Sequence, residues 1–445
     1  MRFRSTNNSA PEVSFKEALL KGQAPDYGLY MPVQLPQFSQ VEIDSFTHLE
    51  YHEIAFEVAK KFLKDQIPND TLKKLCRDAY NFTVPLERLS DTSFIMRLDR
   101  GPTASFKDFA ARLMARLMDY FAKDEKKKLT VLVATSGDTG SAVASAFYNL
   151  LGIKVIILFP EKEVSDTQRK QMTTLGGNVK ALAIKGTFDD CQAIVKRAFN
   201  DKDLSHLNLT SANSINFGRL MPQMVYYIYA YSRIHNRIFS VPSGNFGNLM
   251  GGVLIKKMGL PIERFIVAVN ENDEFPQFLK SGAYNPVVPS KNCSSNAMNV
   301  GHPSNLARLI DMYGGWLADE RDENGKVLKA GVLKQKPDMD ALKRDFVSYS
   351  VSDKEVDQTI VKYYKKYGTL IEPHVAVALA AYEKAGLNLT TVCLETADPA
   401  KFPEKIQKLL GIEPKLPKSL IGLDEKEEYF QIVSKEYEKV KEKIK

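Results

Sequence analysis

Short, nearly continuous apolar runs alternate with helical patterns along most of the chain, and this alternation constrains the fold more than any other feature. The runs are LTVLVA (129–134), VIILF (155–159), VKALAIKG (179–186), RIFSV (237–241), FIVAV (265–269) and TVCLET (391–396). Strands that are apolar along their whole length are typical of parallel sheets buried on both faces. The pattern predicts an α/β fold in which helices cover mostly parallel sheets.

The regions outside this series are predicted to be mainly helical. Residues 1–90 contain the capping box SFKE (14–17) and a helical pattern over 51–63. The polar segment 317–366 is predicted to be helical and peripheral. The C-terminal residues 424–445 are predicted to form one amphipathic helix, with these side chains on one face: Tyr429, Val433, Tyr437, Val440 and Ile444.

Charge and cysteine content exclude several classes of protein. The formal charge of +7 is small for 445 residues, and no compact basic, aromatic-rich stretch predicts nucleic-acid binding. The four cysteines form no CxxC pair, so neither a disulfide framework nor a zinc site is expected. No run approaches the ~18 apolar residues of a membrane-spanning helix. We expect a cytoplasmic protein without a metal ion or a membrane partner, and a mildly basic chain suits an anionic substrate.

Two glycine-bearing loops each follow a predicted strand and open a predicted helix. The first is TSGDTGSA (135–142) and the second is SGNFGN (243–248), which is neither a P-loop nor GxGxxG. Small residues let backbone N–H groups face a ligand, and a helix N-terminus favours an anion. The first loop taken alone has an ordinary βα turn as its alternative. The aromatic residue in the second loop also predicts a pocket for a ring.

Three further segments complete the set of candidates. ASFKDF (104–109) places Lys107 between two aromatic rings just before a helical stretch, and NSINFGR (213–219) ends in Arg219, which can hold a phosphate or carboxylate. ETADPAKF (395–402) puts Thr396 at the carboxyl end of a predicted parallel strand, where α/β folds bind ligands. Taken alone, each of these segments is a weak signal.

Other chemistry is less well supported. His48 and His52 have a metal-ligand spacing, but no third ligand accompanies them, so structural histidines are expected. Ser136 lacks the GxSxG elbow of a hydrolase nucleophile. His374 is open to a role as a general base, although local packing at a helix start is the simpler interpretation.

In combination, these segments resemble the long, bacterial and fungal type of the threonine synthase family. The opening MRFRSTNNSAPEVSFKEALLKGQAPDYGLYMP, the lysine motif ASFKD, and VSDTQRKQMTT, KGTFDDCQ, NSINFGRLMPQ, VPSGNFGN, SSNAMNVGHPSN and ETADPAKF all have family counterparts. The resemblance implies a fold-type II, tryptophan synthase β-like enzyme that uses pyridoxal 5'-phosphate (PLP). It implies two α/β domains with mostly parallel sheets, over 91–215 and 216–445, and a mostly helical N-terminal domain over 1–90.

The resemblance also implies a role for each matching residue. Lys107 is the catalytic residue that bonds to PLP. The cofactor is held by Gly244, Asn245, Phe246, Gly247 and Asn248 at its phosphate and by Thr396 at its ring nitrogen. The substrate is held at its carboxylate and neighbouring groups by Thr135, Ser136, Asp138 and Thr139, and at its phosphate by Asn213, Ser214 and Arg219.

The implied reaction converts O-phospho-L-homoserine and water to L-threonine and phosphate. One alternative is a related phospholyase or dehydratase that releases 2-oxobutyrate. Another is a catalytically silent homologue that acts as a binding protein, although the intact lysine and glycine loops argue against it. A nucleic-acid or membrane binder is a third, supported only by net charge and the C-terminal pattern. The sequence leaves a monomer and a homodimer both open.

Overall fold

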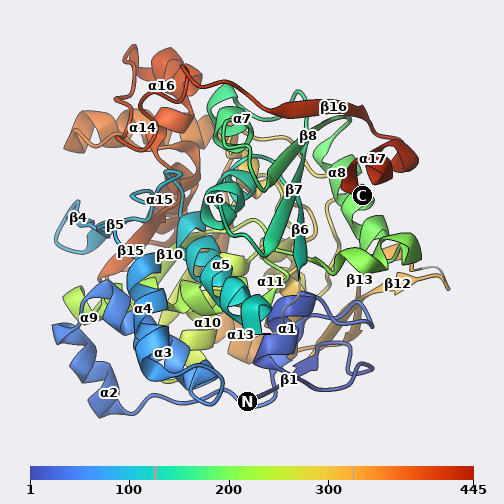
Figure 1. Cartoon of the computed structure of the whole chain (residues 1–445). Coiled ribbons are helices and arrows are strands. Elements are labelled where there is room, and N and C mark those ends of the chain that lie inside the picture. Colours follow the sequence, from blue (N-terminus) through green and yellow to red (C-terminus); the bar gives the residue numbers. More distant parts are fainter. Residues whose placement is uncertain (125–127, 324) are drawn as a thin grey trace.

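Two mostly parallel sheets form the frame of the protein, whose computed structural model describes residues 1–124, 128–323 and 325–445 (Figure 1). The larger sheet has the order β14-β11-β10-β15-β5-β4 and is parallel except for β4, which is antiparallel to β5. Its strands are β4 (Leu86–Arg88), β5 (Ser93–Arg97), β10 (Ile238–Pro242), β11 (Arg264–Val269), β14 (Phe346–Ser350) and β15 (Thr391–Glu395).

The smaller sheet is parallel throughout, in the order β16-β8-β7-β6-β9. Its strands are β6 (Leu129–Ala134), β7 (Ile153–Pro160), β8 (Val179–Lys185), β9 (Leu209–Thr210) and β16 (Phe430–Ser434). Each predicted apolar run is a strand of one of the two sheets, and its side chains are buried almost throughout. The predicted α/β fold is therefore confirmed.

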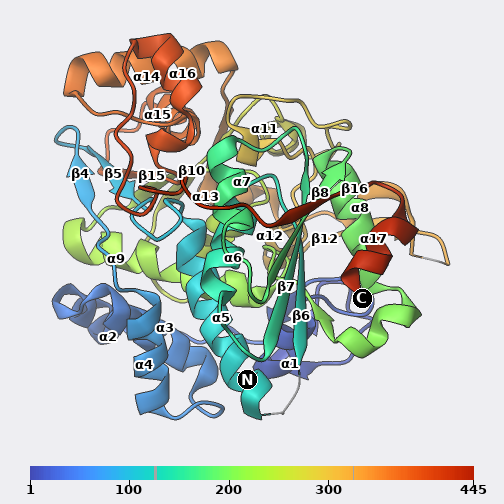
Figure 2. The same ribbon diagram turned by 45° about the horizontal axis from the view of Figure 1, so that its top comes forward.

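Helices surround both sheets. Those near the smaller sheet are α5 (Lys107–Asp124), α6 (Asp138–Phe147), α7 (Asp166–Thr173), α8 (Phe188–Phe199) and α17 (Tyr437–Ile444). Those near the larger sheet are α9 (Met224–Ile234), α10 (Gly247–Lys257), α11 (Glu274–Ser281), α12 (Leu306–Met312), α13 (Met339–Asp345), α14 (Asp353–Tyr367), α15 (Pro373–Ala385) and α16 (Pro403–Leu410). Figure 2 shows α14, α15 and α16 together at one end of the molecule and α17 beside α8. Among the described residues, none of the helices has the length and apolar character needed to span a bilayer.

Short 3₁₀ helices connect several of these elements. They are η1 (Phe46–His48), η2 (Lys202–Leu207), η3 (Phe217–Arg219), η4 (Met221–Gln223), η5 (Asn296–Met298) and η6 (Pro399–Lys401). Two of them, η3 and η6, end at Arg219 and Lys401, which both become important at the site.

The N-terminal region contains the predicted helices and also a small antiparallel sheet. This sheet has the order β2-β1-β3 and is formed by β1 (Arg2–Ser5), β2 (Val13–Ser14) and β3 (Tyr30–Pro32). The helices are α1 (Phe15–Lys21), α2 (Gln40–Ser45), α3 (Tyr51–Leu63) and α4 (Asn69–Ala79). The capping box at Ser14 and Glu17 is confirmed. The ring of Phe3 on β1 packs edge-on against Phe15 and Phe217, which anchors the strand.

Two helical predictions were only partly right. Within 317–366, α13 and α14 are helical, but β12 (Trp316–Arg321) and β13 (Val327–Gln335) form an antiparallel pair and β14 joins the larger sheet. The exposed face of the β12–β13 pair explains its polar composition. The C-terminal segment is strand β16 followed by the short helix α17. The free edge of β8 offers backbone partners to residues 430–434, and this pairing prevails over the helical pattern. Tyr429 consequently lies outside the apolar face and is 53% exposed.

The sheets also show how distant segments come together. Strand β5 lies within the segment 91–215 but pairs with β15, whereas β16 lies within 216–445 but pairs with β8. The three-part division of the chain stays a prediction about folding units, which strand pairing alone does not test.

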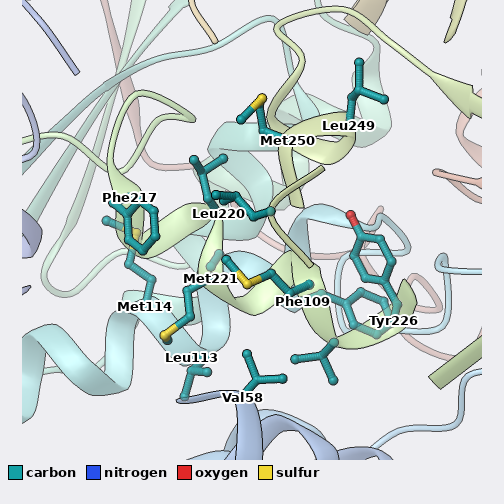
Figure 3. Packing of buried hydrophobic residues seen from close by; sticks show 14 of the residues in the cluster. Val58, Phe109, Leu113, Met114, Phe217, Leu220, Met221, Tyr226, Leu249 and Met250 are labelled. Atoms are coloured by element: carbon teal, nitrogen blue, oxygen red, sulfur yellow. The ribbon is translucent and has the colours of Figure 1, made fainter. Parts of the chain in front are cut away.

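A continuous apolar core lies beneath the loops that carry the candidate site (Figure 3). Phe109 on α5 packs edge-on against Tyr226 on α9, with ring centroids 5.9 Å apart. The Tyr226 hydroxyl in turn donates to Asn248 Oδ1 at 2.6 Å. The core therefore fixes α5, which begins with Lys107, relative to α10, which begins in the second glycine loop.

Candidate active site

A cavity of about 640 Å³ lies where the carboxyl ends of β6, β10 and β15 meet the start of α5. Parallel α/β sheets bind ligands at this edge because the strands deliver their loops there. The cavity brings together all of the predicted site residues: Lys107, Thr135, Ser136, Asp138, Thr139, Asn213, Ser214, Arg219, Gly244, Asn245, Phe246, Gly247, Asn248 and Thr396.

Lys107 is the first residue of α5 and is held in place by the end of β15. The Phe106 N–H donates to the Thr396 carbonyl at 2.9 Å, and the Lys107 Nζ lies 4.5 Å from the centroid of the Phe106 ring. Burial lowers the pKa of Lys107 to about 8; Arg219 and Lys401 act in the same direction, and Asp138 opposes them. About a tenth of this amine is therefore neutral at pH 7, far more than for an ordinary lysine, and the neutral form is the one that acts as a nucleophile or base.

The second glycine loop presents its backbone to the cavity. Within the described part of the chain, the N–H groups from Gly244 to Leu249 donate no hydrogen bond, and they include those of the first turn of α10. Phe246 has the left-handed φ of 60°, which turns the chain into the helix. A Cβ at Gly244 would lie 2.8 Å from the Ala297 carbonyl oxygen, so this close approach requires glycine. The expected role of the Phe246 ring in a ring pocket is not supported, because the ring is buried edge-on against Phe275.

Two buried donors beside this loop have no partner among the described residues. They are Asn248 Nδ2 and Arg219 Nε, on side chains whose residues are 5% and 4% exposed. Tyr226 and Tyr227 both donate to Asn248 Oδ1, which fixes the amide with its Nδ2 as the unused donor. A buried unsatisfied donor is costly, and a buried unpaired guanidinium more so. These donors and the free N–H groups fit the phosphate of PLP and a second anion beside it.

The first glycine loop is shaped by Thr135, whose Oγ1 accepts hydrogen bonds from the N–H groups of Gly137 and Gly140 at 2.9 and 2.8 Å. The backbone N–H groups of Ser136, Asp138 and Thr139 have no partner in the described chain and remain available for a carboxylate. The hydroxyl of Thr135 thus holds the loop together, and the main chain provides the anion site.

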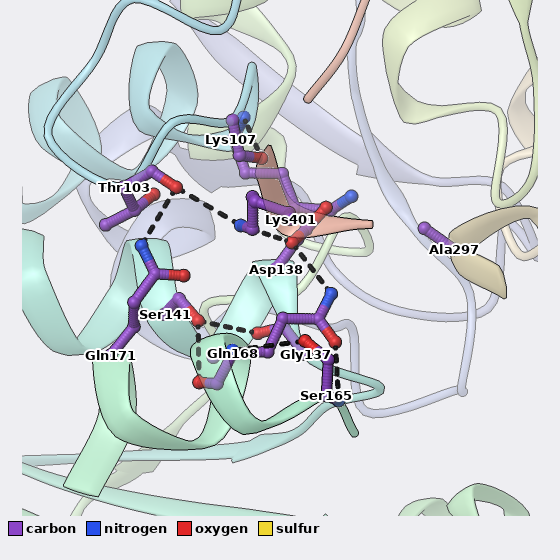
Figure 4. Close-up of polar contacts among 12 residues, drawn as sticks. Thr103, Lys107, Gly137, Asp138, Ser141, Ser165, Gln168, Gln171, Ala297 and Lys401 are labelled. Atoms are coloured by element: carbon purple, nitrogen blue, oxygen red, sulfur yellow. Dashed lines mark hydrogen bonds and ion pairs between the residues drawn. The ribbon is translucent and has the colours of Figure 1, made fainter. Parts of the chain in front are cut away.

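The Asp138 side chain has partners other than the predicted substrate carboxylate. Its Oδ1 lies 2.5 Å from Lys401 Nζ and accepts from Gln168 Nε2 at 3.0 Å (Figure 4). Burial alone would raise the pKa of Asp138, but the Lys401 and Lys107 ammonium groups outweigh it and hold that pKa well below its ordinary value. The carboxylate is therefore ionised, and its charge is balanced from within the protein.

The Asn213–Ser214 loop lies against both glycine loops. Asn213 Nδ2 donates to the Ala134 carbonyl at 3.2 Å. Asn305 Nδ2 bridges the carbonyls of Ser214 and Asn245, at 3.2 and 2.9 Å. The predicted substrate-phosphate and cofactor-phosphate segments are therefore neighbours. Thr396 is 6% exposed, lines the cavity, and its hydroxyl forms no hydrogen bond with the described residues.

The sequence did not single out Lys401 and Gln168, although both lie within quoted motifs. His374 is also better defined by the structure, because its Nδ1 lies 2.5 Å from Glu372 Oε2 and its Nε2 accepts from the Ala297 N–H at 3.1 Å. Both ring nitrogens are thus used, and the imidazole positions the segment that abuts Gly244. Only the spacing of charged residues within the ETADPAKF motif could have drawn attention to Lys401.

Comparisons with known proteins agree with this geometry. Residues 82–394 match the family described as pyridoxal-phosphate dependent enzyme, residues 2–80 match threonine synthase N terminus, and residues 375–444 match threonine synthase, C-terminal. The chain is 37% identical to the threonine synthase of Pseudomonas aeruginosa over 99% of its own length and 97% of that protein. The chain belongs to the threonine synthase family.

Solved structures of family members have the same fold. A PLP-bound threonine synthase from Brucella melitensis aligns with a TM-score of 0.92 and 36% identity, covering 100% of this chain and 98% of that one. The threonine synthase from yeast aligns with a TM-score of 0.89 and 32% identity, again over 100% and 98%. The family assignment confirms the predicted fold-type II architecture and PLP as the cofactor of this threonine synthase family member.

Proposed function

We propose that the protein converts O-phospho-L-homoserine and water to L-threonine and phosphate. One observation carries the proposal: a half-buried lysine with a lowered pKa lies in a cavity that also contains two helix N-termini and a buried guanidinium whose Nε has no partner among the described residues. Two phosphates and a carboxylate must be bound for this reaction, and the cavity provides donors for all three. Membership of the threonine synthase family supports the same substrate.

The cofactor fits the second glycine loop. The N–H groups of residues 244–249 and Asn248 Nδ2 would hold its phosphate, and the Thr396 hydroxyl would face its ring nitrogen. When bound, PLP supplies an electron sink that makes the protons on the substrate's α- and β-carbons acidic. Lys107 would hold PLP covalently until the substrate arrives.

The substrate would bind with its carboxylate at the first glycine loop and its phosphate at Arg219, Asn213 and Ser214. Lys107, with its pKa lowered to about 8, would accept the α-proton and return protons to the carbon chain as the γ-phosphate leaves. Water would add at the β-carbon after the γ-phosphate has left. Arg219 would compensate the charge of the departing phosphate.

Product analysis tests this proposal. The PLP-loaded protein is incubated with O-phospho-L-homoserine, and threonine, phosphate and 2-oxobutyrate are quantified by chromatography. We expect threonine and phosphate in equal amounts, with activity reduced by at least about 10³-fold in Lys107→Ala. Predominant release of 2-oxobutyrate would instead identify a phospholyase.

We also propose that the enzyme is cytoplasmic and acts as a monomer or homodimer. Cys76, Cys191, Cys293 and Cys393 are all buried free thiols, which suits a reducing compartment. The predicted site residues all lie in one chain, so a monomer would be sufficient for the chemistry. Sedimentation of the PLP-loaded protein distinguishes the two states.

A further inference from the structure

A buried ion pair joins two segments that are distant in the chain. Lys401 ends η6, beyond β15 of the larger sheet, whereas Asp138 begins α6 beside the smaller sheet. The two residues are 1% and 4% exposed, and Nζ lies 2.5 Å from Oδ1. Lys401 Nζ also donates to the Thr103 carbonyl at 3.1 Å, so Lys401 lies between the loop before Lys107 and the first turn of α6 (Figure 4).

The position of Asp138 creates an electrostatic problem for the proposed substrate. Its charge lies in the same helical turn as the free N–H groups of Ser136, Asp138 and Thr139, where a substrate carboxylate would bind. Two carboxylates in a site of low dielectric repel one another strongly. Gln168 donates to the same oxygen but carries no charge. Lys401 is the cation in direct contact with Asp138 among the described residues.

We propose that Lys401 is a positioning residue that neutralises Asp138 and thereby makes the N-terminus of α6 a carboxylate-binding site. The inference rests on the proposed function and adds the feature that decides substrate affinity at that loop. A purely structural connection between the two sheets would instead affect every ligand of the cavity equally. The two interpretations are separated by a pair of ligands that differ only in the carboxylate.

Two phosphonates provide this pair. 2-Amino-5-phosphonopentanoate replaces the ester oxygen of O-phospho-L-homoserine with a methylene group and retains the carboxylate, and 4-aminobutylphosphonate lacks that carboxylate. Affinities are measured by titration calorimetry on the PLP-loaded protein. The variants are Lys401→Met, Lys401→Gln, which keeps a donor toward Thr103, and the double variant Asp138→Asn with Lys401→Met. Lys441→Met is the matched control, because Lys441 pairs with Asp203 outside the cavity.

We expect Lys401→Met and Lys401→Gln to weaken the binding of 2-amino-5-phosphonopentanoate on the order of 10²-fold. The affinity of these variants for 4-aminobutylphosphonate, and both affinities of the control variant, should change little. The double variant should recover most of the lost affinity, because it removes the uncompensated charge. The defect of the single variants should diminish as the pH falls and Asp138 takes up a proton. The charged groups that face Asp138 in the described structure are Lys401 and Lys107. In the variants that lack the Lys401 ammonium, Lys107 is therefore the remaining cation that opposes protonation of Asp138.

The inference would be overturned if the single variants bound both phosphonates equally more weakly. It would also be overturned if the double variant bound 2-amino-5-phosphonopentanoate no more tightly than the single variants do. A wild-type protein that binds the two phosphonates equally would overturn it as well, since no carboxylate site would then exist. A wild-type protein that prefers the carboxylate ligand but forms no threonine would overturn the proposed function and leave the role of Lys401 standing.

Discussion

The N-termini of α10 and α6 face the same cavity with the same local construction but with different charge arrangements. Each follows a buried parallel strand through a glycine-bearing loop and leaves backbone N–H groups free. At α10 the nearby side-chain donors, Asn248 Nδ2 and Arg219 Nε, have no hydrogen-bond partner in the described part of the chain. At α6 the first helical residue is the ionised Asp138, paired with Lys401.

This difference shows that a helix N-terminus becomes a specific anion site only through its side-chain surroundings. The α10 loop has an excess of donors and fits a dianion such as a phosphate. The α6 loop has its charge balanced internally, which fits a single carboxylate that is exchanged in every turnover. Three predictions test this comparison, from the largest expected effect to the smallest.

Arg219→Leu should have the largest effect, because it removes a buried guanidinium whose hydrogen bonding within the described residues is limited to the contact of Nη1 with the Ala212 carbonyl. We expect the KM for O-phospho-L-homoserine to rise on the order of 10²-fold, with PLP occupancy close to that of the wild type. Steady-state kinetics and the visible absorbance of the bound cofactor measure the two quantities. Arg233→Leu, which removes a guanidinium that donates to main-chain carbonyls outside the cavity, is the control. Loss of PLP with an unchanged KM would show that the two phosphate sites are interchanged.

Substitution of a glycine in one loop should weaken the binding of one ligand and leave the binding of the other ligand unchanged. A Cβ at Gly244 meets the Ala297 oxygen at 2.8 Å and the Met298 Cα at 3.0 Å, whereas a Cβ at Gly140 meets the Thr135 Cγ2 at 2.5 Å. Overpacking of this kind costs about 1–3 kcal/mol. Gly244→Ala should therefore weaken the binding of PLP. Gly140→Ala should weaken the binding of 2-amino-5-phosphonopentanoate while PLP stays bound. Equilibrium dialysis and calorimetry measure these affinities, and a shared loss of both ligands would contradict the separation of the two sites.

The smallest effect concerns Lys107, which lies between the two loops. Burial lowers its pKa to about 8, Asp138 acts to raise that pKa, and Arg219 acts to lower it. Removal of the anion in Asp138→Asn should lower the pKa further, and removal of the cation in Arg219→Leu should raise it. Capture of pyridoxal, which lacks the phosphate, requires the neutral amine and should increase with pH through a midpoint at this pKa. Borohydride reduction and peptide mapping report capture at Lys107, and midpoints that shift in the same direction would refute the opposed effects.

Particular residues show how far sequence reasoning reaches. Lys107, Thr396 and both glycine loops were found because each depends on a local pattern that a strand end or helix start imposes. The prediction for 424–445 was wrong at residues 430–434 because Val433 fits a helical stripe as well as a strand, and only the free edge of β8 decides between them. The role expected for Asp138 changed for a related reason, since its partner lies far along the chain.

The sequence by itself determined the α/β fold, the parallel strands and the positions of the two glycine-bearing loops, because side-chain periodicity and glycine placement act over a few residues. Only the tertiary structure decided which charges meet. The contact of Lys401 with Asp138, and the lack of a described partner for Arg219 Nε, depend on how the two sheets are brought together, and burial strengthens the electrostatic effect of each charge.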